Sequence, residues 1–258
     1  MLDILNNGNE IAIIVAAAFL LAGVVKGVIG IGLPTTAITI MTFFISPLMA
    51  LGLNLIPMTV TNIWQFSKAD NPKKIVANYK YFAITLVICI LITSFYANQI
   101  GDNVIRIIFA CAVLLFVSVN FFGFNFKMNP KHDVFWQSSL GTLGGIFGGA
   151  ASIWAVPVTM YLLMKNVKPK HFVDVSGFLI TIGCIPVSFG YIATGVFQPN
   201  MFIYGALGSV TAMIGFQFGE KLRNKINAKT FKNLLLIFFS IAALKMIIQS
   251  LIEFNVLF

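Results

Sequence analysis

Long apolar runs constrain the fold of this chain more than any other feature of its sequence. Charged residues make up only 10% of the chain, whereas a soluble globular domain carries roughly 25%, so most of the surface must face lipid. At roughly 20 apolar residues per crossing, the chain has room for about eight or nine membrane segments. We therefore expect an all-α, polytopic membrane protein that forms one transmembrane domain over residues 1–258. The runs lie at residues 11–29, 34–45, 48–66, 78–97, 103–124, 134–149, 153–164, 171–194, 200–219 and 231–252.

Two of these runs are too short to cross a bilayer. Residues 34–45 and 153–164 are the length of half-helices or re-entrant segments. Each follows a glycine-rich break that ends in proline, at residues 30–34 and 148–157. Because glycine and proline interrupt helices, we expect a broken or re-entrant helical hairpin at each break.

The glycines before the two breaks predict an internal repeat, with chance spacing in a glycine-rich chain as the alternative. We expect two related halves, at about 11–127 and 134–254, each with a hairpin followed by three spanning helices. Matching intervals separate two sets of glycines, which are Gly23, Gly27 and Gly30 in the first half and Gly141, Gly145 and Gly148 in the second.

Loop charge predicts the topology of the two halves. The net charge of +9 lies mainly between apolar runs, which indicates membrane orientation rather than a nucleic-acid partner. Loops 98–103 and 195–200 carry no Lys or Arg. Since basic loops stay in the cytoplasm, we predict cytoplasmic basic loops and external termini. The basic clusters are Lys68, Lys73, Lys74 and Lys80; Lys127 and Lys131; Lys165, Lys168 and Lys170; and Lys221, Arg223, Lys225, Lys229 and Lys232.

Aligning the two halves places three of the basic loops on segments without Lys or Arg, so matching positions face opposite sides of the membrane. This predicts an inverted-topology repeat, which is a plan of secondary transporters. Helix breaks expose backbone N–H groups, and in a membrane these survive only beside protein or a wet cavity. We expect the two breaks to meet near the midplane, where helix N-termini favour an anion.

The candidate site residues follow from this geometry. Lys26 is a candidate counter-charge, with snorkelling or internal pairing as its alternatives. Asp174 is a candidate for proton coupling, with capping of its helix as the alternative. For Gly23, Gly27, Gly141 and Gly145 we expect interhelical packing, with a role in the site as the alternative. Polar residues such as Asn62 have interhelical hydrogen bonding as their alternative role. The predicted substrate-binding set is Lys26, Gly30, Gly32, Thr35, Asn62, Gly148, Gly149, Ser152 and Trp154.

Signals for catalysis or cofactors are absent from the sequence. The two histidines, His132 and His171, lie in basic loops, and the three cysteines lie inside apolar runs without metal-ligand spacing. The chain has no phosphate-binding loop. We therefore expect neither an enzyme, nor a metal or cofactor site, nor ATP-driven transport by this chain alone.

The segments Gly23–Pro34 and Gly141–Gly149 resemble the glycine-rich turns of the TauE/SafE sulfite exporter family, also called the 4-toluene sulfonate uptake permease family. The resemblance implies a secondary transporter in the bacterial inner membrane that moves sulfite, sulfonates or other small organic anions. The first break is shorter than the usual turn of that family. Lys26 also stands where the family more often has a small or polar residue.

These observations predict a permease that binds a small anion between the breaks and works by alternating access. An anion channel and a membrane-embedded assembly protein without transport activity are the alternatives. Saturable, coupled flux would distinguish the permease from the channel. An assembly protein leaves the broken helices unexplained.

Overall fold

The computed structural model describes residues 8–121, 128–223, 225 and 228–256, and within these ranges it contains helices and no strand. The predicted all-helical architecture is confirmed. The helices are α1 (Gly8–Ile29), α2 (Leu33–Met41), α3 (Pro47–Ser67), α4 (Pro72–Asn78), α5 (Lys80–Ser94), η2 (Ala97–Gln99), α6 (Asp102–Phe121), η3 (Pro130–His132), α7 (Asp133–Ala151), α8 (Ala155–Met164), α9 (Pro169–Ala193), α10 (Met201–Arg223) and α11 (Ala228–Val256).

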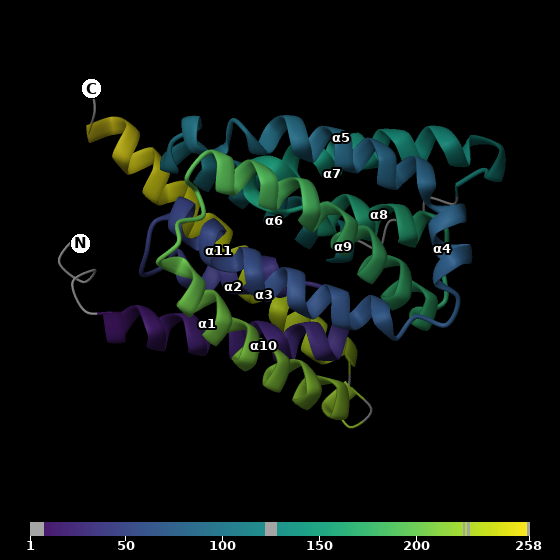
Figure 1. The fold of residues 1–258 in the computed structure, drawn as a ribbon, viewed down its shortest axis with the longest axis horizontal. Coiled ribbons are helices and arrows are strands. Elements are labelled where there is room, and N and C mark those ends of the chain that lie inside the picture. Colours follow the sequence, from purple (N-terminus) through teal and green to yellow (C-terminus); the bar gives the residue numbers. More distant parts are fainter. Residues whose placement is uncertain (1–7, 122–127, 224, 226–227, 257–258) are drawn as a thin grey trace.

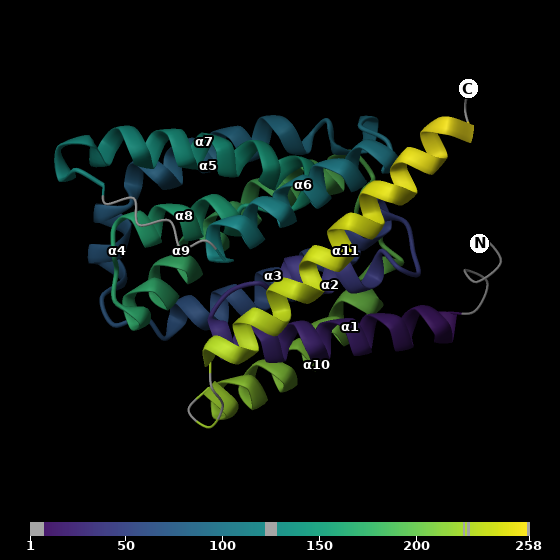
Figure 2. The same cartoon turned by 180° about the vertical axis from the view of Figure 1, so that it is seen from behind.

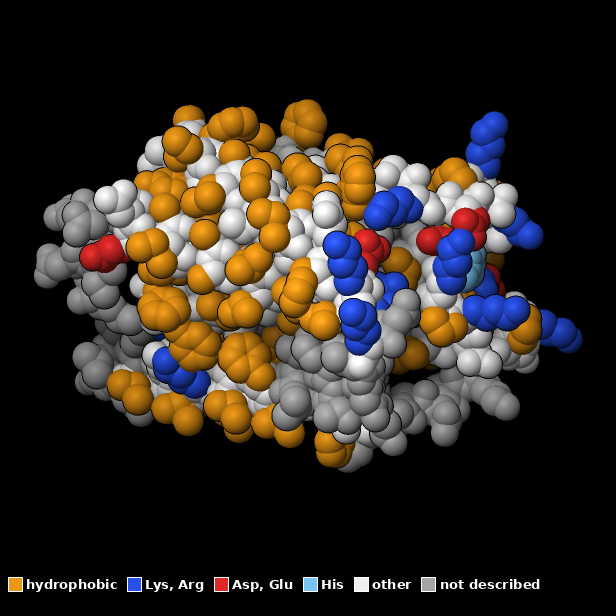
Figure 3. All heavy atoms as spheres, turned by 90° about the horizontal axis from the view of Figure 1, so that it is seen from below, with side chains coloured by type: hydrophobic (Ala, Val, Ile, Leu, Met, Phe, Trp, Pro, Cys, Tyr) orange, Lys and Arg blue, Asp and Glu red, His pale blue; other side chains and the backbone are white. Residues whose placement is uncertain are grey.

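Several of these helices suit a membrane by length and composition. Among the described residues four pass as full spans, namely α1, residues 102–119 of α6, α9 and α10. A fifth would be α4 with α5, which are bent by 74° at Tyr79. Two shorter apolar stretches, Ala155–Met164 and Leu236–Ile252, also lie within the described part of the chain. Figure 3 shows the accompanying surface, on which hydrophobic side chains cover much of one face while most of its charged side chains gather toward one end.

Both predicted breaks interrupt the chain. α1 ends at Ile29, and the following Gly30 and Gly32 have φ values of 95° and 99°, which side chains with a Cβ rarely adopt. α2 then begins at Leu33, with proline in its first turn, and packs back on α1. Figures 1 and 2 show that α2 returns toward the end of the molecule at which α1 starts.

The second break is shorter than predicted. α7 continues to Ala151, Ser152 takes a left-handed φ of 55°, and α8 begins at Ala155. The prediction that Gly148 and Gly149 lie in the break is therefore wrong, because both belong to the last turn of α7. Their backbones pack on α5, where a Cβ at Gly149 would lie 2.6 Å from the Ser94 nitrogen and 2.8 Å from the Ile90 oxygen.

Glycines on the facing sides of two helix pairs allow the helix backbones to approach closely. A Cβ at Gly23 or Gly27 of α1 would overlap backbone atoms of α10, and one at Gly145 of α7 would overlap Cys89 of α5. Small residues allow such close backbone approach in membranes. The contacts thus show the interhelical packing expected for these glycines. Figures 1 and 2 show α1 beside α10 and α5 beside α7.

Loops of like charge lie at the same end of the molecule. The two loops without Lys or Arg meet where Asn98 Nδ2 donates to the Thr194 oxygen at 2.7 Å. At the other end Lys68 pairs with Glu220 at 3.5 Å, and Lys170 pairs with Asp70. The start of α1 and the end of α11 lie on the side of the loops without Lys or Arg (Figure 1). Lys127, one of the predicted cytoplasmic residues, lies outside the described ranges, as do the side chains of Lys229 and Lys232.

Candidate functional site

The Lys26 side chain lies inside the protein, at the end of α1, with 1% of its surface exposed. Its Nζ donates to Asn62 Oδ1 at 2.5 Å and to Thr61 Oγ1 at 3.3 Å, both on α3. The ring of Phe216 lies 6.0 Å from the nitrogen. No carboxylate of the described residues forms an ion pair with Lys26. The ammonium is thus surrounded by neutral groups, and it does not snorkel to the surface.

The acceptors of Lys26 are fixed by the local structure of α3. The Asn62 amide nitrogen donates to the Met58 oxygen at 2.7 Å, so its oxygen must point toward Lys26. The Thr61 hydroxyl donates to the Pro57 oxygen at 2.8 Å, which leaves an oxygen lone pair for the ammonium. The structure therefore brings the predicted residues Lys26 and Asn62 together. It adds Thr61, which the sequence presented only as one polar group among several.

The first break lies next to this lysine. Gly30 packs against α9, where an added Cβ would lie 2.7 Å from Val173 Cγ2. Thr35 is buried in α2 with 3% of its surface exposed. The sequence missed two other hydroxyls of the same helix: Thr36 Oγ1 and Thr39 Oγ1 are buried without a hydrogen-bond partner among the described residues. Their spacing of three residues on a helix could have indicated a shared polar face.

The second break is packed against α9. Ser152 Oγ lies 3.2 Å from the Tyr191 hydroxyl oxygen. Trp154 is 1% exposed, and Cβ atoms added to Gly148 and Gly183 would lie 2.9 and 3.0 Å from its ring. The indole fills space between α7 and α9. Its Nε1 has no hydrogen-bond partner within the described part of the chain.

The two breaks contact α9 at different levels. The first lies against Val173, and the second lies against Gly183 and Tyr191. Ten residues separate Val173 from Gly183, which corresponds to about 15 Å along a helix. The expectation that the two breaks meet near the midplane stays a prediction. The residues gather around Lys26 in the first hairpin and around Trp154 in the second.

A cavity of about 790 Å³ lies at the basic end, beyond Lys26. Gln65, one helical turn from Asn62 on α3, is 3% exposed and lines the cavity. Its amide nitrogen donates to the Val173 oxygen at 2.7 Å and to Ser176 Oγ at 3.3 Å. Gln65 thus stands between the cavity and the lysine. Other residues of the lining include Ile29, Lys68, Asp174, Glu220 and Arg223.

Asp174 lies on the wall of this cavity and of a neighbouring one of about 410 Å³. It is 7% exposed and lies close to Asp70 and Lys170. Asp174 follows Val173, the residue of α9 against which the first break packs. The structure therefore places Asp174 at the basic end, on the cavity side of the first hairpin.

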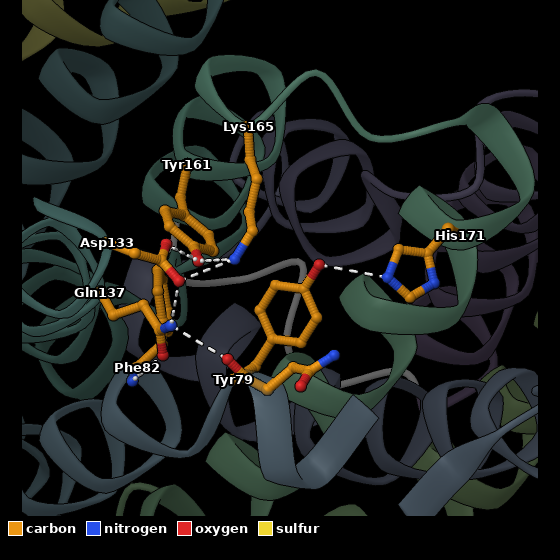
Figure 4. Close-up of polar contacts among 8 residues, drawn as sticks. Tyr79, Phe82, Asp133, Gln137, Tyr161, Lys165 and His171 are labelled. Atoms are coloured by element: carbon orange, nitrogen blue, oxygen red, sulfur yellow. Dashed lines mark hydrogen bonds and ion pairs between the residues drawn. The ribbon is translucent and has the colours of Figure 1, made fainter. Parts of the chain in front are cut away.

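A polar cluster joins the second hairpin to its neighbours at the basic end, and we call Asp133, Gln137, Tyr161 and Lys165 the base cluster. Asp133 accepts from Tyr161 at 2.7 Å, from Lys165 at 2.9 Å and from Gln137 at 3.1 Å. Gln137 also binds the Asn78 oxygen and the Phe82 nitrogen. Figure 4 shows these side chains converging on Asp133 while Tyr79 points toward His171. The cluster ties both ends of the hairpin to α5.

The helical architecture and its apolar surface define an integral membrane protein, in which a buried lysine with neutral acceptors lies beside the first helix break. Within the described ranges no group of three or more His, Cys, Asp or Glu is arranged to hold a metal ion. Residues 15–246 match the model of the sulfite exporter TauE/SafE family, so the chain belongs to that family. Its members are membrane transporters, not enzymes. No curated protein and no solved structure matches the chain.

Proposed function

We propose that the chain is a secondary transporter that carries a small anion across the bacterial inner membrane by alternating access. Sulfite, sulfonates and related organosulfur or organic anions are the candidate substrates. The observation that carries the proposal is Lys26, a buried lysine whose acceptors are neutral. Family membership supports an anion as the class of substrate.

The cost of burying Lys26 favours an anionic partner. A charged side chain in a membrane is expensive and usually pairs or takes part in function. The oxygens of Thr61 and Asn62 accept two of the three ammonium hydrogens. An oxyanion could accept the third and supply the missing negative charge. The nearby N-terminus of α2, at Leu33, carries a partial positive charge that adds to the attraction.

The approach to Lys26 supports access from the basic side. The 790 Å³ cavity reaches Gln65, one turn of α3 from Asn62. In the second hairpin, the unpartnered Trp154 Nε1 is a further donor that an anion could use. We propose that the remaining predicted residues, Gly30, Gly32, Thr35, Gly148, Gly149 and Ser152, shape these two regions. For Gly148 and Gly149 we propose that this role is exercised through packing on α5.

Helix packing supports an inverted repeat. In the proposed alignment α1 corresponds to α7, and α10 corresponds to α5. α1 packs on α10, and α7 packs on α5. The alignment therefore turns one packed pair into the other. A cavity of about 550 Å³, lined by Ser46 and Gly195, lies at the end of the loops without Lys or Arg. Its counterpart of about 410 Å³, lined by Lys168 and Asp70, lies at the basic end. An inverted repeat would account for the matching helix pairs and for the matching cavities at opposite ends.

Transport of sulfite into proteoliposomes tests the proposal. Lys26→Met removes the charge while retaining an apolar chain of similar length, and we expect it to abolish saturable uptake. Lys245→Ala is the matched control, because Lys245 is an exposed lysine of α11 that lies 4.1 Å from the Phe43 ring. Normal uptake by Lys26→Met would refute the counter-charge role. Flux that does not saturate would identify a channel.

Asn62→Asp tests the charge of Lys26 by adding a negative group beside it instead of removing the positive one. A carboxylate at this position would lie beside the ammonium, 2.5 Å from it in the present geometry. It would satisfy Lys26 internally and repel an anion, so we expect loss of sulfite uptake in a protein that still folds. A thermal-shift panel of sulfite, thiosulfate, sulfonates and carboxylates would identify the preferred anion. Full uptake by the Asn62→Asp protein would contradict the proposed site.

A further inference from the structure

Arg223, at the end of α10, binds the carbonyl end of α1. Its Nη2 donates to the Gly27 oxygen at 2.6 Å, and its Nε lies 3.0 Å from the oxygens of both Gly27 and Val28. These carbonyls directly follow Lys26 in the chain. The contact therefore joins the last turn of α1 to a helix that lies 196 positions further along the sequence.

The break after α1 explains why these carbonyls need a partner. The last four C=O groups of an α-helix have no N–H donor within the helix. α1 cannot continue past Ile29, because Gly30 and Gly32 adopt positive φ values. The Lys26 oxygen is used by the Gly30 nitrogen at 2.7 Å. Arg223 supplies donors for the next two carbonyls from outside the helix.

The same contact changes the electrostatics of the candidate site. The C-terminus of a helix carries a partial negative charge of roughly half a unit. At α1 that charge lies directly beside Lys26, where it would repel an anion. A guanidinium bound to these carbonyls offsets it. We propose that Arg223 is a positioning residue for the anion site, which neutralises the carbonyl end of α1 and fixes the turn that carries Lys26.

The surroundings of Arg223 favour this role over an ordinary surface ion pair. The nearest acidic residue along α10, Glu220, pairs with Lys68 of α3 at 3.5 Å. Arg223 lines the 790 Å³ cavity through which an anion would approach. Glycine contacts between Gly27 and Gly219 hold α10 against α1 in this region. A planar guanidinium can bridge two carbonyls in a fixed orientation, which the ammonium of lysine does less well.

The inference rests on the proposed function, and the experiment separates the two. We would reconstitute Arg223→Gln, Arg223→Lys and the control Lys221→Gln, which removes an exposed charge from the same turn. Sulfite uptake gives KM and Vmax. The unfolding temperature without anion reports the fold, and its rise on adding sulfite reports binding. The same binding measurement is made for Lys26→Met and for the double variant Lys26→Met/Arg223→Gln.

We expect Arg223→Gln to raise KM by about twofold to thirtyfold, which is the range for losing a charge that offsets a helix dipole. The unfolding temperature without sulfite should fall, because the Gly27 and Val28 oxygens lose their donors, whereas Vmax should change little. Arg223→Lys should recover part of the affinity, and Lys221→Gln should behave like the wild type. In the Lys26→Met background, Arg223→Gln should cause no further loss of binding.

Three results would overturn the inference. An unchanged KM in Arg223→Gln would remove any role in the site. A lower unfolding temperature with unchanged KM would leave Arg223 as a structural cap. A loss of binding in the double variant beyond that of Lys26→Met would show that Arg223 acts independently of the lysine. Full sulfite binding by Lys26→Met would instead refute the proposed function, whatever the behaviour of Arg223.

Discussion

Replacing Gly145 by alanine tests the glycine contact that holds the second hairpin on α5. An added Cβ at this position would overlap Cys89 Cβ and lie 3.0 Å from the Leu86 oxygen and 3.1 Å from Cys89 Cα. Ordinary carbon contacts lie at roughly 3.5–4.0 Å. Two of these three atoms belong to the backbone, so the helices must separate.

The neighbouring glycine provides a matched control. A Cβ at Gly144 would lie 3.2 Å from Leu86 Cδ1, the far end of a flexible side chain, and no nearer than 3.6 Å to the next atoms. Alanine in a helix interior gains about 0.5–1 kcal/mol over glycine. Gly144→Ala should therefore leave the free energy of unfolding unchanged or raise it by up to about 1 kcal/mol.

For Gly145→Ala the overlap outweighs that gain. Overpacking costs about 1–3 kcal/mol, and separation of the helices also strains the hydrogen bond from Thr93 Oγ1 to the Gly145 oxygen, now 2.9 Å. That bond contributes about 1 kcal/mol. We expect a net loss of about 1–3 kcal/mol, and a fall of several degrees in unfolding temperature at about 2–4 °C per kcal/mol.

The assay is thermal unfolding of the two purified variants in the same detergent, followed by intrinsic tryptophan fluorescence. We expect Gly145→Ala to unfold at a lower temperature than the wild type and Gly144→Ala to unfold at the same or a higher one. If Gly145→Ala unfolded with the wild type, or if Gly144→Ala were the less stable of the two, the close α5–α7 contact would not hold in the protein.

Three further predictions concern charge. Asp133→Asn weakens its bonds to Lys165 and Tyr161 and should cost about 1–2 kcal/mol, which unfolding measurements against the wild type would reveal; equal stability would contradict the base cluster. Reporter fusions at Gly195 and Lys225 should read external and cytoplasmic, and matching readings would contradict the proposed topology. Asp174→Asn should lose acceleration of sulfite uptake by a proton gradient, whereas unchanged coupling would leave Asp174 with a structural role.

The sequence predicts the helical architecture because membrane segments leave a strong compositional signal. Runs such as 171–194 and 200–219 correspond closely to α9 and α10. The first break is also readable, because Gly30 and Gly32 lie within four residues of Pro34, and glycine readily adopts the positive φ values found there. The sequence places the start of the second break too early, since Gly148 and Gly149 give the same compositional signal while packing inside α7.

The partners of the site residues could not be read from the sequence. Lys26 stood out as a lysine in an apolar run, but its hydrogen bonds to Thr61 and Asn62 depend on how α1 meets α3. Arg223 appeared only as part of a basic cluster, and its binding to Gly27 depends on the packing of α10 on α1. Contacts of this kind join residues that are 35 to 196 positions apart, and no local pattern encodes them.

The two hairpins are anchored on helices of opposite halves, and this exchange determines which parts can move together. Glycine contacts and Arg223 hold α1 on α10, and glycine contacts with the Thr93 bond hold α7 on α5. A moving hairpin would therefore carry a helix of the other half with it. The bonds from Lys26 to Asn62 and Thr61 join α1 to α3, so we expect movement of the α1–α10 pair against α3 to break them. An anion that replaces those acceptors lowers the cost of the movement, which would couple substrate binding to the change of access.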